Sequence, residues 1–179
     1  SHWGIVVKNM LTNHRFPEAR DMLIAFKDYP LGMSSLIYYF CLFLGNNQGI
    51  MIMCQNMFIF SCFYAMFGII EEKKRFLLYV ILSTGCTFMI YLNITIRIQN
   101  LLVDFILPLL TLAICSYIYH QRDDLMSALY LIPLLGFLTV IKEIGFFFVL
   151  IAFIYWQWYC WHSSFSLMQK LIMTITILI

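Results

Sequence analysis

The sequence predicts an all-α protein, a polytopic bundle of transmembrane helices preceded by an outer-face loop of short amphipathic helices. Hydrophobic residues make up 63% of the chain and charged residues 11%, well below the roughly 25% that is usual in soluble domains. The 179 residues include 17 Phe and 11 Met, and mean hydropathy is +0.86. Charges gather in short clusters between long apolar runs. A soluble core of this size has no room for so many large apolar side chains, which indicates a membrane protein.

The same composition argues against several other classes of protein. Net charge is only +2 and no basic run suggests nucleic-acid binding, so we expect no nucleic-acid partner. The six cysteines are scattered through apolar stretches with no CxxC pair, and the four histidines show no metal-ligand spacing. Small helix-packing residues are therefore the simplest interpretation of the cysteines.

Residues 1–49 predict an outer-face loop that lies on the membrane. An amphipathic interfacial helix is indicated by apolar residues at i, i+3, i+4 and i+7 spacing, namely Trp3, Val6, Val7 and Met10. A second short helix is expected at residues 18–26. The stretch Lys27–Gly32 then predicts a turn, because Pro30 disfavours the helical conformation at Tyr29 and glycine permits a sharp bend.

Residues 36–44 predict a helix that does not cross the membrane. This run holds only nine apolar residues before the polar stretch Gly45–Gly49, whereas a crossing takes about 20 residues. Unpaired polar backbone groups are not tolerated in hydrocarbon. We therefore expect a re-entrant or interfacial helix at this place.

The remaining residues, 50–179, predict a transmembrane bundle. Apolar runs mark six spans, at residues 50–70, 76–92, 105–119, 125–141, 144–161 and, incompletely, 171–179. Short connections between consecutive runs predict antiparallel neighbours. Asp104 is interpreted as the N-cap of the third span, with Pro108 in its first turn, where a missing N–H is harmless. Because the chain begins without Met and ends inside an apolar run, we expect it to be a fragment.

The orientation of the bundle is predicted from basic residues in the connections. Five of them fall on one side of the spans, which places that side inside the cell: Lys73, Lys74, Arg75, Arg122 and Lys170. The N-terminal loop, Arg97, Asp104 and Lys142 then face outward. The outward total is six basic residues once the loop is counted, so charge counting alone leaves the orientation open.

Ionisable groups at the outer ends of the spans form the candidate site. The Lys27–Gly32 turn, Arg97, Asp104 and the Lys142–Glu143 pair all reach this face by the parity of the spans. Charged groups near hydrocarbon are costly to desolvate and often mark function. Simpler interpretations remain open: a helix cap for Asp104, an interfacial anchor for Arg97, and snorkelling or local pairing for Lys142 and Glu143.

Three segments in the same order resemble motifs of a known family. They are Phe26–Gly32 followed by Tyr38 and Tyr39, then Arg97–Asp104 leading into a span, and Leu138–Gly145 two spans later. Together they are similar to the membrane glycosyltransferases of the GT-C superfamily, especially the bacterial family related to protein mannosyltransferases and lipid A aminoarabinose transferase. The chain departs from that family where Leu31 replaces a second proline.

The resemblance implies a glycosyltransferase of the bacterial cell envelope. Its expected reaction moves a sugar from a polyprenyl-phosphate donor to an acceptor hydroxyl on the outer face of the cytoplasmic membrane. Ser1–Gly4 resembles the segment that follows an acidic pair in some Gram-positive membrane proteins, so the resemblance places the main catalytic base before Ser1. Asp104 becomes a second catalytic carboxylate that positions the acceptor or a divalent metal ion. Substrate binding is assigned to His2, Lys27, Asp28, Tyr29, Arg97, Lys142 and Glu143.

A second interpretation is a non-enzymatic multi-pass protein, such as a transporter or an assembly subunit. In that case Lys142 and Glu143 form a buried coupling pair and the protein needs no outer acidic motif. An acidic residue a few positions before Ser1 favours the transferase, whereas a start typical of a cytoplasmic segment favours the alternative.

Overall fold

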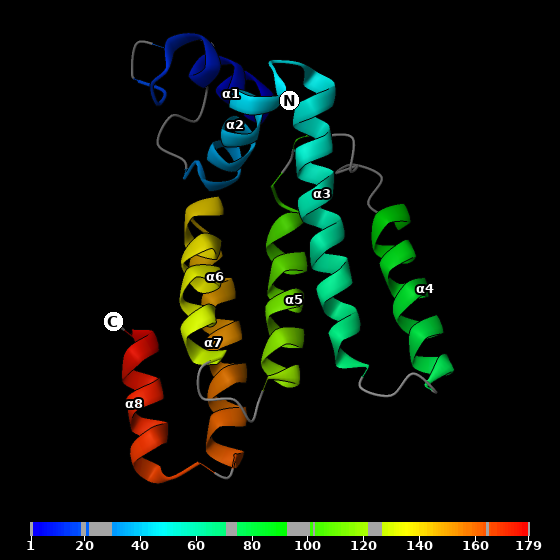
Figure 1. The fold of residues 1–179 in the computed structure, drawn as a ribbon, viewed down its shortest axis with the longest axis vertical. Coiled ribbons are helices and arrows are strands. Elements are labelled where there is room, and N and C mark those ends of the chain that lie inside the picture. Colours follow the sequence, from blue (N-terminus) through cyan, green and yellow to red (C-terminus); the bar gives the residue numbers. More distant parts are fainter. Residues whose placement is uncertain are drawn as a thin grey trace.

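The computed structural model describes residues 2–18, 21, 30–70, 75–92, 101, 103–121, 127–163 and 165–178, and every regular element within these ranges is helical (Figure 1). The all-α prediction is therefore confirmed. In order, the helices are α1 (His2–Asn13), α2 (Gly32–Leu44), α3 (Gln48–Met66) with the 3-10 turn η1 (Phe67–Ile69), α4 (Phe76–Leu92), α5 (Ile106–His120), α6 (Ser127–Ile141), α7 (Gly145–His162) and α8 (Leu167–Leu178). Most of the helix expected at residues 18–26 lies outside the described residues.

The helices from α3 to α8 run alongside one another, and consecutive helices point in opposite directions (Figure 1). This is the antiparallel arrangement that the short connections predicted. Helices α1 and α2 lie together at the end of the bundle where α3 begins, α5 begins and α6 ends (Figure 1). We call this end the α2 end. The N-terminal loop, Asp104 and Lys142 were all predicted to lie on one face, and the fold brings their helices to this end.

The boundary between α2 and α3 is formed by the polar stretch that was expected to interrupt the apolar run. Gly45 ends α2 with a φ of 105°, in the left-handed region that favours glycine. Asn47 then caps α3, because its side-chain oxygen accepts the backbone N–H of Gly49 at 2.9 Å. The connection lies at the α2 end, as expected for a helix that does not cross the bundle (Figure 1). Helix α2 begins at Gly32, four residues earlier than predicted.

Helix α5 forms the centre of the core. Nine of its residues are buried: Ile106, Leu107, Leu109, Leu110, Thr111, Ala113, Ile114, Ser116 and Ile118. It packs mainly against α3 and α7, and less closely against α6. The Ser116 hydroxyl donates to the backbone oxygen of Ala65 at 2.8 Å, which ties α5 to the last turn of α3.

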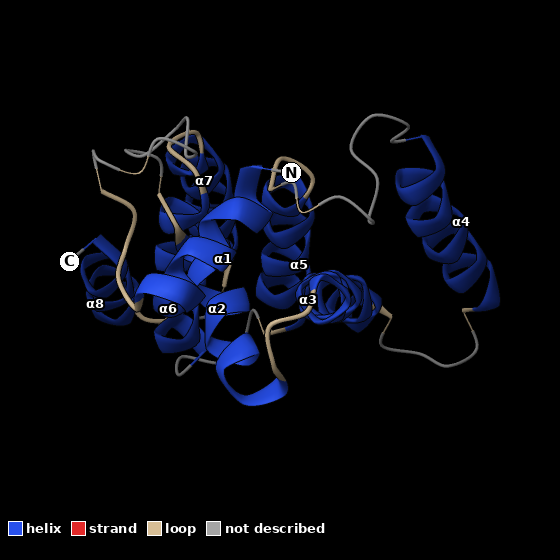
Figure 2. Cartoon of the chain, turned by 90° about the horizontal axis from the view of Figure 1, so that it is seen from above, coloured by secondary structure: helices blue, strands red, loops and turns tan. Residues whose placement is uncertain are grey.

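Helix α4 stands apart from the other helices (Figure 2). It makes one stacked aromatic contact, between Tyr79 and Phe67 of η1, with ring centroids 6.2 Å apart. Its large apolar side chains are mostly exposed, and Tyr91 is 78% exposed. The 17 residues of α4 carry no charge, so both sides of this helix are apolar.

Among the described residues, one helix is long and apolar enough to span a membrane, namely the 22 residues Gln48–Ile69 with a mean hydropathy of 1.7. This agrees with the predicted span at residues 50–70. Four further helices are apolar but shorter: Gly32–Leu44, Phe76–Tyr91, Ile106–His120 and Leu129–Ile141.

Candidate functional site

The structure brings together Asp104 and Lys142, two residues of the predicted site. Asp104 lies in a turn just before α5, and Lys142 directly follows the last residue of α6. The Lys142 ammonium donates to Asp104 Oδ1 in an ion pair that joins residues 38 positions apart. The Asp104 side chain is 42% exposed and that of Lys142 is 28% exposed. The pair therefore lies at the surface of the α2 end, where a ligand can reach it.

The N-cap interpretation of Asp104 is wrong. The residue that precedes α5 is Phe105, which has helical angles (φ −74°, ψ −28°), and no side chain caps this helix. The turn is closed by the backbone instead, because the Ile106 N–H donates to the Val103 carbonyl at 3.0 Å. Pro108 does lie in the first helical turn, as predicted. The Asp104 carboxylate is thus not needed by α5 and points to a cation on another helix.

Of the other predicted site residues, the structure describes the side chain of Glu143. Glu143 lies next to Lys142 in the turn between α6 and α7 and is exposed. Lys142 pairs across to Asp104, so the local-pairing interpretation of Lys142 with Glu143 is not what the structure has. Lys27, Asp28, Tyr29 and Arg97 lie outside the described residues, as does the side chain of His2.

Two apolar cavities are lined in part by α6, the helix that Lys142 follows. The first, of about 460 Å³, is formed by side chains of α2, α3, α5 and α6, among them Leu36, Leu110 and Phe137. The second, of about 450 Å³, is nearer to the pair, because Val140 lines it two residues before Lys142. Leu36 and Phe137 line both cavities, so the two lie next to each other. Each volume is in the range of sites that bind small ligands.

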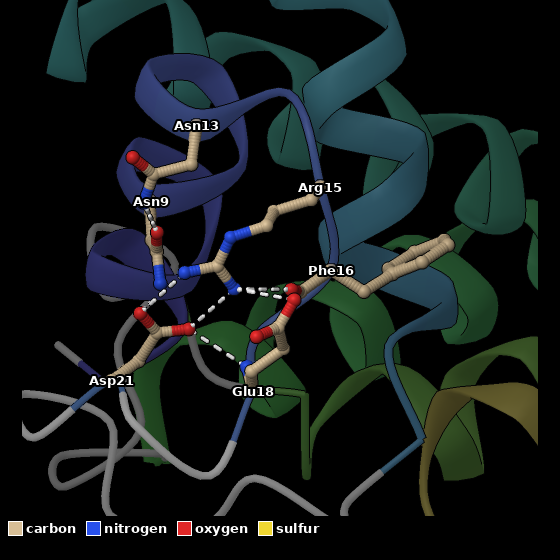
Figure 3. A network of polar contacts seen from close by, with 6 residues as sticks. All are labelled: Asn9, Asn13, Arg15, Phe16, Glu18 and Asp21. Carbon is tan, nitrogen blue, oxygen red and sulfur yellow. Dashed lines mark hydrogen bonds and ion pairs between the residues drawn. The ribbon is translucent and has the colours of Figure 1, made fainter.

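A second acidic residue at the α2 end, Asp21, is paired quite differently (Figure 3). His14 ends α1 in the left-handed region with a φ of 50°, and the next residue is Arg15. The Arg15 guanidinium donates to both oxygens of Asp21, at 2.9 and 3.0 Å, and the Glu18 backbone N–H donates to the same carboxylate at 2.7 Å. These bonds form a clasp over residues 15–21. Sequence reasoning missed it, because a loop of this kind has no periodic signal.

The clasp shifts the pKa values of both of its charged groups. The hydrogen bond from Arg15, followed by that from the Glu18 backbone, holds the pKa of Asp21 well below its ordinary value. The hydrogen bond to Asp21 raises the pKa of Arg15. Both groups therefore stay charged at neutral pH, as the ion pair between them requires.

No described part of the chain is built to hold a metal ion with three or more His, Cys, Asp or Glu side chains. Asp104 supplies one carboxylate. Asp104 is therefore the one residue to which the resemblance assigns a divalent ion.

No family model, curated protein or solved structure matches this chain.

Proposed function

We propose that the protein is a polytopic membrane glycosyltransferase that moves a sugar from a polyprenyl-phosphate donor to an acceptor hydroxyl at the outer face of the membrane. The observation that carries the proposal is the Asp104–Lys142 ion pair, which joins the start of α5 to the end of α6, two helices that contribute to the lining of apolar cavities. A lipid-phosphate donor needs both features at one place. The phosphate of the donor would bind the Lys142 ammonium, and its apolar polyprenyl chain would occupy a cavity.

The dimensions of α7 support the membrane assignment. Its 18 residues extend about 27 Å, close to the roughly 30 Å of membrane hydrocarbon. Lys142 and Glu143 precede it, and the exposed Trp158 and Trp161 lie near its other end. Charged residues at one boundary and tryptophans at the other are typical of a membrane-spanning helix. We therefore propose α7 as a further span beside α3, the one described helix that is both long and apolar enough to cross, with the shorter apolar helices completing the bundle.

An exchange of partners explains how the ion pair serves this chemistry. In the free protein Lys142 neutralises Asp104. When the donor binds, its phosphate displaces Asp104 from the ammonium, and the carboxylate becomes available to position the acceptor hydroxyl or a divalent ion. The acceptor oxygen then bonds to the anomeric carbon as the bond from that carbon to the phosphate oxygen breaks. Lys142 stabilises the departing phosphate, and the acceptor proton passes to a carboxylate, which the resemblance places before Ser1.

The proposal is tested by measuring sugar transfer from polyprenyl-phosphate donors in liposomes that contain the purified full-length protein, including any segment that precedes Ser1. Wild type should transfer the sugar, and Asp104→Asn should be slower by about 10²-fold, the effect expected when an electrostatic or acid–base group is lost. The matched control is Asp21→Asn, which removes the other paired carboxylate at the α2 end and should leave transfer unchanged. Equal transfer by wild type and Asp104→Asn would refute the role of Asp104. Absence of transfer with every such donor would favour the non-enzymatic alternative.

A further inference from the structure

We propose that Gly32 and Gly145 are positioning residues for Lys142. They allow α2 and α7 to pack directly on the last turn of α6, and this packing sets where the Lys142 ammonium lies relative to Asp104. The inference deepens the proposed function, because it identifies what holds the phosphate-binding cation in place. The packing itself is measurable without any assay of sugar transfer.

Gly32 is the first residue of α2 and lies against the last turn of α6. A Cβ atom at this position would lie 2.5 Å from the carbonyl oxygen of Val140 and 2.8 Å from Val140 Cγ2, whereas ordinary contacts begin at 3.4 Å. The carbonyl belongs to the backbone and cannot turn aside as a side chain would. Any side chain at position 32 therefore pushes α2 and α6 apart by about 1 Å, since close-packed interiors have no slack to absorb it.

Gly145 makes a still closer contact from the opposite side. It begins α7, and a Cβ atom there would overlap the carbonyl oxygen of Leu138 and lie 2.9 Å from the carbonyl carbon. The Gly145 N–H donates to the Lys142 carbonyl at 2.8 Å, so the two residues are the ends of one tight turn. The same position lies 3.5 Å from Leu107 Cδ2, three residues after Asp104 on α5. A displacement of Gly145 thus moves the backbone of Lys142 and disturbs the helix that carries its partner.

The two contacts fix one short segment from two sides. Leu138 and Val140 lie in the last turn of α6, where the last carbonyls of a helix have no partner within it, and Lys142 directly follows that turn. A hydrogen bond weakens once the donor and acceptor separate by more than about 3.2 Å, so a shift of about 1 Å is enough to weaken the bond from the Lys142 ammonium to Asp104. The flexible lysine stem can follow such a shift only by giving up rotamer freedom. The decisive measurement is therefore made on the ammonium itself.

The test is competitive acetylation of the intact protein with acetic anhydride, read by mass spectrometry as the labelling of Lys142 relative to Lys8. Lys8 is an exposed residue of α1 and serves as the internal reference. Asp104→Asn gives the ratio for an ammonium that has lost its carboxylate partner. Gly32→Ala and Gly145→Ala should raise the ratio toward that value. Gly136 lies on α6, and nothing is within 4 Å of a methyl group added there. Gly136→Ala should therefore leave the ratio at its wild-type value.

An unchanged ratio in folded Gly32→Ala and Gly145→Ala would overturn the proposal. Loss of folded protein in both variants, with Gly136→Ala folded, would assign the glycines to folding alone and would overturn it equally. If only Gly145→Ala fails to fold, the ratio in Gly32→Ala decides. A raised ratio in the glycine variants, together with no sugar transfer by wild type, would refute the proposed function and leave the positioning role standing.

Discussion

Asp104 and Asp21 both face a cation at the α2 end, but the two carboxylates differ in how much of their bonding capacity is already used. Both Asp21 oxygens accept bonds, from Arg15 and from the Glu18 backbone, and its side chain is only 14% exposed. Among the described residues, Asp104 is bonded through Oδ1 alone, and its side chain is 42% exposed. A carboxylate has about four acceptor positions, so Asp104 keeps more of them for a ligand than Asp21 does.

The two pairs also differ in what they connect. The clasp closes a loop of residues six positions apart, and its guanidinium holds the carboxylate in a planar, two-bond arrangement. The Asp104–Lys142 pair connects two helices through a single flexible ammonium, which is a compact charge on a mobile stem. The first arrangement is suited to fixing a loop, and the second to exchanging one anion for another. The predictions below test this difference, from the largest expected effect to the smallest.

Replacement of Lys142 should have the largest effect. Lys142→Met removes the cation and keeps most of the apolar stem, so the KM for the lipid-phosphate donor should rise by roughly tenfold or more, the scale of one hydrogen bond to a charged group. Arg15→Met removes the cation of the clasp and should leave this KM unchanged. Steady-state transfer rates over a range of donor concentrations measure both. An equal rise of this KM in Lys142→Met and Arg15→Met would contradict the proposal that only the Asp104–Lys142 pair binds the donor.

Cysteine labelling should show that the α2 end lies outside the cell. Asn47 and Ser166 make a matched pair, because each is exposed, precedes a helix and accepts a backbone N–H of that helix, but they lie at opposite ends of the bundle. In a background without the six native cysteines, Asn47→Cys should react with an impermeant thiol reagent in intact cells, and Ser166→Cys should react only after lysis. The reverse pattern would place both acid–base pairs on the cytoplasmic side.

The positions of the helices were largely predictable from the sequence, because long apolar runs separated by charges have few other solutions. The predicted span 105–119 corresponds to α5 at Ile106–His120, and 125–141 to α6 at Ser127–Ile141. The early start of α2 was missed, because Ser34 and Ser35 made its first turn look polar. Ser34 is nevertheless buried, at 1% exposed, since α2 packs against α1, α3 and α6. Tertiary packing decided that boundary.

The candidate site was predictable only in part. Counting spans placed Asp104 and Lys142 on one face, because each crossing reverses the direction of the chain. Their pairing was not predictable, since it depends on how α5 and α6 pack, and a local rule instead suggested that Asp104 caps its own helix. The Arg15–Asp21 clasp was missed for a related reason: a bond that closes an irregular loop has no periodicity in the sequence. Local sequence patterns predicted where the helices lie, whereas the pairing of the charged side chains depends on contacts between distant parts of the chain.

Opening the clasp should expose the bond after Arg15 to trypsin. Asp21→Asn keeps an oxygen that can accept one bond but removes the charge that holds the guanidinium, so cleavage between Arg15 and Phe16 should become several times faster. Glu18→Gln is the matched control, because Glu18 contacts the guanidinium only at 3.4 Å. Peptide mapping during a brief digestion measures both rates. Unchanged cleavage in Asp21→Asn would mean that the clasp does not protect this loop.

The smallest expected effect is the response of the clasp to mild acid. The folded-state pKa of Asp21 is lowered, so its contribution to stability is fully present above the unfolded-state pKa of about 3.9 and is lost only as the pH falls through the lower folded value. The Glu18 amide donates to Asp21, so its protection from hydrogen exchange should stay constant between about pH 5 and pH 4. An ordinary aspartate begins to take up protons in this range. Hydrogen exchange, corrected for the intrinsic rate at each pH, measures this protection. Asp21→Asn should show low protection throughout the range. Protection that disappears with a midpoint near the ordinary aspartate pKa would show that Arg15 does not hold the Asp21 carboxylate in its charged form. The distinction between the two ion pairs would then fail.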